Sequence, residues 1–335
     1  MGKLGRPPRS LDQVGAATFV LPGQDDVLAR IESALGDAVV VDDAYLNQIA
    51  SHLIDAGGKR LRPLLTVAAA QVAQVGVRQE AILGGVSCEL VQTGSLYHDD
   101  VMDEAPTRRG VDTVNAVWGN LQAILAGDFL LAKASEIAAS LGTEVAGLLA
   151  RTIMRLCEGQ IEELRHTYNS ARPEVSYLAS ICGKTASLFA TAARIGGLVA
   201  DLPRPMVESL TAYGEAYGMV FQIVDDLLDL TASDDQLGKP AGHDMVEGVY
   251  TLPVLRTLQG GGVAAAELVG LFGKPLTVAE RDKALAIVRQ HGGLDAARRT
   301  AQQYVDQAVA ACAALPAGPA VDVLIAAPTA LLASV

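Results

Sequence analysis

The sequence has little of the chemistry on which disulfide scaffolds and zinc sites depend. Only four cysteines and five histidines occur among its 335 residues. No two cysteines form a CxxC pair, and no two histidines form an HxxxH pair. Scattered thiols of this kind are typical of reduced cysteines in a cytoplasmic protein. We therefore exclude a disulfide-rich secreted fold and do not expect a metal site built on imidazole.

Long apolar runs and glycine-rich phosphate loops are also missing. The apolar C-terminal stretch is interrupted by Asp322 and Pro328, so it is too short to span a bilayer. No glycine-rich turn joins a predicted strand to a helix, which excludes Rossmann and P-loop sites. Residues 1–24 lack a signal-peptide pattern and are interpreted as a disordered leader, with a single domain over 25–335.

Basic residues are scarce, with 26 Lys and Arg against 38 Asp and Glu and a net charge of −12. Non-specific nucleic-acid binding needs a basic surface, so we expect no nucleic-acid partner. An acidic excess does not exclude an anionic ligand, because metal ions or clustered cations can bind it locally.

The sequence does contain many apolar residues at helical spacing. Leu121, Ile124 and Leu125 illustrate the three- and four-residue intervals that recur along most of the chain. Half of all residues are hydrophobic, which is enough for a sizeable core. The pattern predicts an all-α fold, a large single-domain helical bundle.

One short motif, DDxxD, occurs twice, as Asp99-Asp100-Val101-Met102-Asp103 and as Asp225-Asp226-Leu227-Leu228-Asp229. On a helix the first and last aspartates of each motif share a face, where like charges repel. A divalent cation reverses that penalty, and Mg²⁺ is usually shared between carboxylates and substrate phosphates. Because apolar residues flank both motifs, solvated acidic turns are the weaker interpretation. The motifs predict a magnesium and phosphate site.

Cations gather beside sharp local signals. The run Gly57-Gly58-Lys59-Arg60-Leu61-Arg62-Pro63 places three cations within four residues. Arg108-Arg109-Gly110 follows the first DDxxD, and Lys184-Thr185 and Gly238-Lys239-Pro240 come later. Glycine lets the backbone approach a phosphate, Arg binds it with two hydrogen bonds, and Lys acts as a point charge. Each signal alone also fits an ordinary helix start or a solvated side chain.

Together these motifs resemble the trans-isoprenyl (polyprenyl) diphosphate synthases, and most closely their medium- and long-chain bacterial branch. The similar segments run in the family's order from about residue 50 to 255: GGKRLRP, SLYHDDVMDEAPTRRG, GDFLLA, GKTASLF, FQIVDDLLDL and LGKPAGHDMVEG. The resemblance implies an all-α fold around a central cavity and a homodimer. It also implies Mg²⁺-dependent head-to-tail condensation of isopentenyl diphosphate with an allylic primer, farnesyl or geranylgeranyl diphosphate.

The resemblance assigns roles to individual residues. Three Mg²⁺ per site are expected on Asp99, Asp103, Asp225 and Asp229, with support from Asp100 and Asp226. The allylic diphosphate is expected on Arg108, Lys184 and Lys239. Isopentenyl diphosphate is expected on Lys59, Arg62, Gln92 and Arg109, and Thr185 and Gln222 are expected to steady the cationic intermediate. The family often has Lys at the position of Val249 and a basic C-terminal helix, so this chain departs from it at both places.

The helix before Asp99 predicts product length. Ser95, Gly94, Val91 and Cys88 fall on roughly the same face, along which the growing chain is expected to pass. Gly94, Ser95 and Val91 are small enough to leave a tunnel open, which predicts an all-trans product of about C30–C50 that a Gly94→Phe substitution shortens. The alternative interpretation of these small residues is close helix packing.

Three other functions stay open at this stage: a C20 geranylgeranyl diphosphate synthase, a non-catalytic subunit of a heteromeric synthase, and a class I terpene cyclase. The cyclase is disfavoured because its second metal motif mixes Asn, Ser or Thr and Glu, unlike the DDLLD found here. Non-catalytic subunits usually lose aspartates, whereas both motifs are intact. An apolar product also predicts transient membrane contact at its release.

Overall fold

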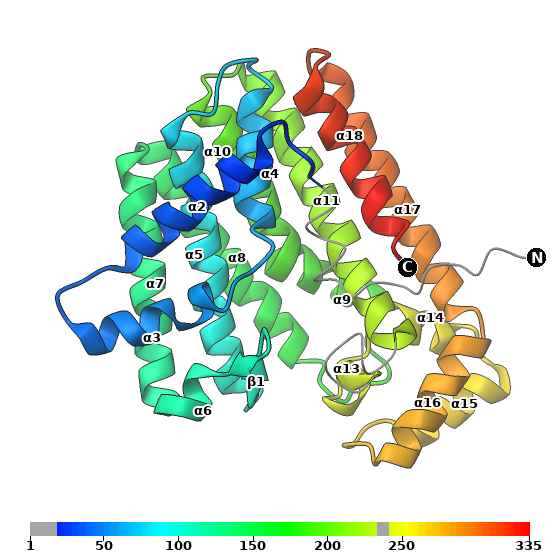
Figure 1. Ribbon diagram of the computed structural model, residues 1–335. Coiled ribbons are helices and arrows are strands. Elements are labelled where there is room, and N and C mark those ends of the chain that lie inside the picture. The colour runs from blue at the N-terminus through cyan, green and yellow to red at the C-terminus, as the bar shows by residue number, and fades with distance from the viewer. Residues whose placement is uncertain (1–18, 233–240) are drawn as a thin grey trace, which may run out of the picture.

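Helices are the main element in the part of the chain that the computed structural model describes, residues 19–232 and 241–335 (Figure 1). The first group comprises α2 (Gln24–Val39), α3 (Ala44–Asp55), α4 (Leu61–Gln71), α5 (Gln79–Met102), α6 (Val114–Trp118), α7 (Asn120–Ser140) and α8 (Thr143–Leu164). The second group comprises α9 (Glu174–Ile181), α10 (Ser187–Val199), α11 (Arg204–Thr231), α13 (His243–Val246), α14 (Leu252–Gln259), α15 (Gly262–Leu271), α16 (Val278–Gln290), α17 (Gly293–Ala311) and α18 (Pro319–Leu332).

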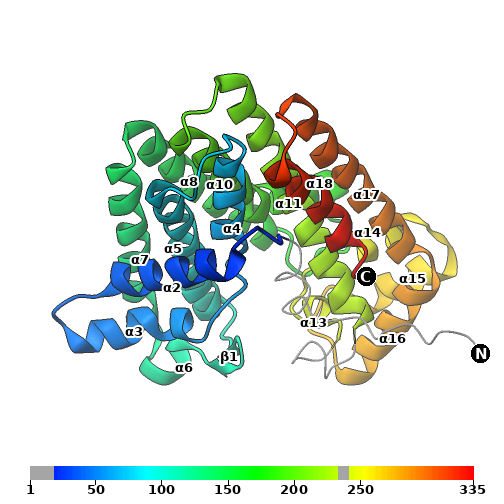
Figure 2. The same cartoon turned by 45° about the horizontal axis from the view of Figure 1, so that its top comes forward.

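The long helix α11 lies at the centre of the molecule. In both views α4, α5, α7, α8 and α10 lie on one side of it and α14 to α17 on the other (Figures 1 and 2). Two apolar clusters fill the interior, and α11 contributes to both, through Leu210 and Tyr217 to one and through Ile223 and Leu227 to the other. The predicted all-α bundle is therefore confirmed.

One short hairpin departs from the prediction of helices throughout. Strand β1 (Thr107–Arg108) pairs antiparallel with β2 (Val111–Asp112), directly after the first DDxxD. The two residues between them, Arg109 and Gly110, have φ angles of 53° and 78°. Two consecutive positive φ angles are what a two-residue hairpin turn needs. The Arg-Arg-Gly run is therefore a turn that presents two arginines side by side.

Glycines allow the helices around α4 to approach closely. A Cβ added at Gly85 of α5 would lie 2.5 Å from the Cα of Pro63, and one at Gly196 of α10 would lie 2.3 Å from the carbonyl oxygen of Thr66. No real Cβ fits at such distances. The absence of these side chains therefore sets the spacing of α5 and α10 around α4.

Packing begins earlier in the chain than the predicted boundary at residue 24. Phe19 and Leu21 are buried, and the Phe19 ring lies 4.9 Å from that of Tyr217 in α11. The interpretation of residues 19–24 as part of a disordered leader is therefore wrong, because an aromatic ring this close to α11 gains from burial. Residues 1–18 lie outside the described residues.

The apolar C-terminal stretch forms α18, with Pro328 inside the helix. Leu324 and Leu331 are fully buried against the rest of the bundle. Within the two described ranges, no helix is long and apolar enough to cross a membrane.

We expect Gly196→Ala to lower the free energy of unfolding by about 1–3 kcal/mol, because the new methyl group overpacks the contact with α4. Gly36→Ala is the matched control, since Gly36 is exposed in α2 and a Cβ there meets nothing within 4 Å. This control should gain about 0.5–1 kcal/mol from the better helix propensity of Ala. Urea titration of both variants measures the effect, and equal stabilities would contradict the close contact.

Candidate active site

The first aspartate motif lies at the C-terminal end of α5, and its three carboxylates differ in environment. Asp100 is buried and accepts a hydrogen bond from Nε of Arg108 in the hairpin. Asp99 is half-buried, and Asp103, the residue after the helix, is exposed. The middle aspartate therefore positions Arg108, while the outer two remain available to a ligand.

Crowding makes these carboxylates costly to ionise without a cation. Asp103 is exposed as a residue, but the protein atoms around its carboxyl group partly desolvate it, and this desolvation, followed by the charges of Glu247 and Asp99, raises its pKa to about 6. Burial also raises the pKa of Asp99, although Lys184 and Arg108 oppose the change. Two carboxylates that lack enough positive charge nearby are a fitting place for a divalent cation.

Lys184 extends into this site from a π-helical segment, Cys182–Ala186, between α9 and α10. Its ammonium group lies 2.8 Å from Oε1 of Glu163 in α8. Burial alone would lower the pKa of Lys184, but Glu163 and Asp99 outweigh burial and raise it. A Cβ at Gly159 of α8 would lie 2.4 Å from the backbone nitrogen of Lys184, so glycine is what admits the π segment. The lysine therefore stays charged beside the first motif.

The second aspartate motif lies near the end of α11, and its middle carboxylate is held on both oxygens. The Tyr177 hydroxyl donates to Oδ2 of Asp226, and Nε2 of Gln222 donates to Oδ1 at 3.0 Å. Thr185 Oγ1 donates to Oε1 of Gln222 at 2.8 Å, which fixes the orientation of the amide. Asp226 is buried, whereas Asp225 is exposed, so Asp226 is a positioning residue here.

Asp229 of the second motif lies deeper than Asp225. It is buried, and its Oδ2 accepts from the backbone N–H of Asp244 at 3.4 Å. Burial and then Asp244 raise the pKa of Asp226 well above its usual range, which places another carboxylate next to this motif.

The donor set fits Mg²⁺ only together with a ligand that supplies oxygens. Both motifs offer hard carboxylate oxygens, which Mg²⁺ prefers. Among residues 19–232 and 241–335, however, no three His, Cys, Asp or Glu side chains gather closely enough to hold an ion by themselves. Such a site needs substrate oxygens to complete the coordination of the ion.

A second group of cations lies on aromatic rings between α4, α10 and α11. Lys59 Nζ is 5.8 Å from the centre of the Phe221 ring, and the Arg62 guanidinium is 4.5 Å from that of Phe189. Burial lowers the pKa of Arg62 to about 10, so the side chain remains charged at neutral pH. Its Nε is buried and has no hydrogen-bond partner. A buried cation with an unused donor is suited to binding an anion.

Arg109 joins this second group from the hairpin. Its Nη1 donates to the carbonyl oxygen of Leu53 at 2.7 Å, and its Nη2 lies 3.8 Å from Oε1 of Glu89. A Cβ at Gly58 would come within 3.3 Å of the Arg109 guanidinium, so the glycine gives this arginine room. Gln92 is half-buried on α5, one turn after Glu89.

Arg60, the middle cation of the GGKRLRP run, holds neighbouring helices together. Arg60 is buried and bonds Glu32 at 2.7 Å and Glu89 at 3.1 Å, and its Nη2 also donates to the carbonyl oxygen of Ile54. It links α2, the end of α3, and α5 at the start of α4. Arg60 therefore holds helices together and is not a candidate for binding a ligand.

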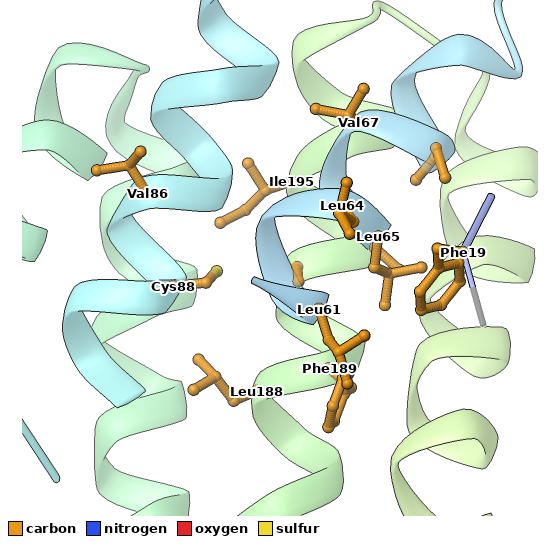
Figure 3. Packing of buried hydrophobic residues seen from close by; sticks show 14 of the residues in the cluster. Phe19, Leu61, Leu64, Leu65, Val67, Val86, Cys88, Leu188, Phe189 and Ile195 are labelled. Carbon is orange, nitrogen blue, oxygen red and sulfur yellow. The ribbon is translucent and has the colours of Figure 1, made fainter. Parts of the chain in front are cut away.

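The face of α5 before Asp99 is only partly as predicted. A Cβ at Gly94 would lie 3.0 Å from the carbonyl oxygen of Gly127 and 3.3 Å from Cγ of Leu131, both in α7. Gly94 thus faces a helix contact, which favours the close-packing alternative and removes the basis for using Gly94→Phe as a test of chain length. Cys88 points from α5 toward α4 and α10 (Figure 3), Val91 is also buried, and Ser95 is half-buried one turn before Asp99.

Several residues of the site were missed from the sequence. Glu89 forms an ion pair with Arg60, and Glu163 forms one with Lys184. Tyr177 donates a hydrogen bond to Asp226. The one available signal was Glu89, a lone acidic residue within an apolar stretch of α5. Lys239, by contrast, was predicted to bind the allylic diphosphate but lies outside the described residues.

Comparison with known proteins agrees with this geometry. A polyprenyl synthetase family model matches residues 43–288. Nonaprenyl diphosphate synthase of Mycobacterium tuberculosis is 39% identical over 307 residues, which cover 91% of each chain. Heptaprenyl diphosphate synthase component 2 of Geobacillus stearothermophilus is 38% identical over 87% of this chain and 90% of that protein.

The fold is also that of a solved relative. A polyprenyl synthase from Caulobacter crescentus CB15, crystallised with calcium and isoprenyl diphosphate, has a TM-score of 0.88 and 33% sequence identity. The match covers 98% of this chain and 99% of that one. The chain therefore belongs to the polyprenyl synthetase family.

Proposed function

We propose that this protein condenses isopentenyl diphosphate head-to-tail with an allylic diphosphate, farnesyl or geranylgeranyl diphosphate, to give an all-trans polyprenyl diphosphate. Membership of the family makes the chain a prenyltransferase. One observation carries the proposal most directly: there are two separate cation groups, one around Lys184 beside the first aspartate motif and one around Arg62 on the Phe189 ring, and Arg109 of the second group acts electrostatically on Asp100. A site of this kind can bind two diphosphates, one at each cation group.

The first cation group suits the allylic substrate. Asp99, Asp103, Asp225 and Asp229 are the residues that would hold Mg²⁺, three ions per site, and Arg108, Lys184 and Lys239 would bind the diphosphate directly. When bound, the metal ions neutralise the leaving diphosphate and so favour ionisation of the allylic C–O bond. Glu163 and Asp100 keep Lys184 and Arg108 in position for this task.

The second cation group suits isopentenyl diphosphate. Arg62 and Lys59 offer charge above the Phe189 and Phe221 rings, and Arg109 and Gln92 would complete the set. The two rings lie 5.2 Å apart and present an apolar face near these cations. Such a face suits the hydrocarbon part of the same substrate.

The remaining chemistry needs no general base from the protein. The double bond of isopentenyl diphosphate attacks the allylic cation, and the released diphosphate accepts the proton that is lost. Thr185 and Gln222, fixed by their hydrogen bonds to each other and to Asp226, orient oxygen atoms toward the developing positive charge.

We expect prenyl products when the enzyme is incubated with isopentenyl diphosphate, farnesyl or geranylgeranyl diphosphate and Mg²⁺, and none after chelation with EDTA. Lys184→Met should lower kcat by about 10²-fold or more, since the charge beside the leaving group is lost. Mass spectrometry of the dephosphorylated products is the measurement. Failure to make any product with either primer would favour a non-catalytic subunit, and a product that stops at C20 a geranylgeranyl diphosphate synthase.

The length of the product is proposed to be about C30–C50. Two relatives named for nonaprenyl and heptaprenyl products support this range, as do the small Ser95 and the modest Val91 on α5. Ser95 takes the place of Gly94 as the residue to test, because it lies one turn before Asp99 and is half-buried.

We expect Ser95→Phe to shorten the product by blocking the path of the chain. Ser95→Ala is the control, because it removes only the hydroxyl that donates to the Gln92 carbonyl oxygen. Mass spectrometry compares the chain-length distributions of the two variants with that of the wild type. An unchanged length in Ser95→Phe would contradict a path along this face of α5.

The enzyme is proposed to act as a homodimer. Leu121 and Leu125 on α7 are 74% and 67% exposed, and Ile124 is exposed beside them. Exposed apolar residues on the neighbouring helix α8 include Met154 and Ile161. Exposed apolar residues on two neighbouring helices are usual where a second subunit binds.

We expect Leu125→Asp to convert the dimer to a monomer, because dimerisation would bury the new charge. Val263→Asp is the matched control, since Val263 is 76% exposed but lies on α15, away from α7. Light scattering coupled to size-exclusion chromatography gives both masses. A dimer that persists in Leu125→Asp would place the interface elsewhere.

A cytoplasmic location is proposed as well. All four cysteines are free thiols, which suits a reducing compartment. Release of an apolar product is proposed to involve transient contact with a membrane.

A further inference from the structure

The connection between α8 and α9 contains a strained residue next to the site. Tyr168 has a φ angle of 59°, in the left-handed region that bulky residues rarely adopt. Backbone strain of this kind persists where surrounding contacts hold the residue in place. The contacts of Tyr168 are therefore informative.

Tyr168 holds one segment, Val246 to Gly248, at three points. Its backbone N–H donates to the carbonyl oxygen of Gly248 at 2.8 Å, and its hydroxyl donates to that of Val246 at 3.3 Å. Its ring fills the space beside the Gly248 Cα, where a Cβ would lie 2.5 Å from the ring. Gly248 itself has a φ angle of 80°. The Tyr168 ring can occupy its position only because residue 248 has no Cβ.

The segment that Tyr168 holds carries two carboxylates toward the two aspartate motifs. The backbone N–H of Asp244 donates to Oδ2 of Asp229, and Asp244 acts electrostatically on Asp226. Glu247 forms an ion pair with His243 at 2.9 Å and acts electrostatically on Asp103. One short segment thus reaches both motifs.

The segment is held by its apolar side chains and by backbone hydrogen bonds, because Met245 is buried in the second apolar cluster and Val246 packs against it. Helix α13 has only four residues, and its start is tied to α11 through the bond from Gly242 N–H to the Asp229 carbonyl oxygen. At its end, Val249 N–H closes a turn onto the Asp244 carbonyl oxygen within the segment itself. The contacts of Tyr168 join this end to the connection between α8 and α9.

We propose that Tyr168 is a positioning residue that holds the segment from Asp244 to Gly248 against the two aspartate motifs, and so sets how tightly the site binds a magnesium–diphosphate complex. The inference rests on the proposed role of those motifs in binding Mg²⁺. Tyr168 touches neither substrate in this arrangement and acts only through the segment that it holds.

Two variants separate the ring from the backbone. Tyr168→Gly keeps the N–H and suits a positive φ, but it removes the ring and the hydroxyl. Tyr168→Phe removes only the hydroxyl. The matched control is Gln74→Gly, because Gln74 also has a positive φ, of 56°, but lies at the end of α4 far along the sequence from either motif.

Calorimetric titration of inorganic diphosphate in the presence of Mg²⁺ is the first measurement. We expect affinity to fall about tenfold in Tyr168→Gly and about two- to threefold in Tyr168→Phe, as for lost contacts of this kind. The KM for isopentenyl diphosphate should stay within about twofold of the wild type, since Arg62 lies on the Phe189 ring and Arg109 donates to Leu53, both outside the segment. Wild-type affinity in Tyr168→Gly, with only the melting temperature lowered, would overturn the proposal.

Hydrogen exchange without any ligand is the second measurement, and it does not depend on the proposed function. The amides of residues 243–249 should exchange at least about tenfold faster in Tyr168→Gly than in Gln74→Gly. Equal exchange in the two variants would overturn the positioning role. Faster exchange combined with no binding of magnesium–diphosphate by the wild type would instead overturn the proposed function and leave the positioning role supported.

Discussion

The arrangement of the site depends on the cost of keeping carboxylates charged inside apolar helices. Burial raises the pKa of Asp99 and Asp103, and each nearby carboxylate adds to the effect. The protein answers with cations that are themselves held by acids, Lys184 by Glu163 and Arg108 by Asp100. Because these partners come from α5, α8, the hairpin and the π segment, the electrostatic requirement determines how four parts of the chain meet.

The chemistry of the site could be predicted from the sequence because its residues lie in short sequence motifs. The aspartates of DDxxD are four apart, and helix geometry alone places them on one face. Lys59 and Arg62 likewise follow from one basic run, and the structure brings both to the same pair of rings. The distinction between them and Arg60 could not be predicted, because it depends on Glu32 and Glu89, 28 and 29 residues away.

The errors share one physical cause, since local spacing does not reveal what lies opposite a residue. Gly94 was placed on a tunnel because it is small, but it is small because Gly127 of α7 lies against it. Phe19 was placed in a leader because its apolar patch is brief and lacks a signal-peptide pattern, yet its ring packs against Tyr217. The hairpin was also missed, but for a different reason. A glycine in a turn between two short extended segments is a local signal, which the prediction of helices throughout did not use.

The hairpin has a consequence for the two diphosphate sites. Arg108 contacts the first aspartate motif, while Arg109, the next residue, contacts Leu53 and lies beside Gly58 near Arg62. The two proposed sites therefore meet at adjacent residues, the last residue of β1 and the first residue of the turn. If a ligand at one proposed site displaces Arg108, the adjoining Arg109 is the shortest covalent route to the other, and any coupling between the two affinities must be reciprocal by thermodynamic linkage.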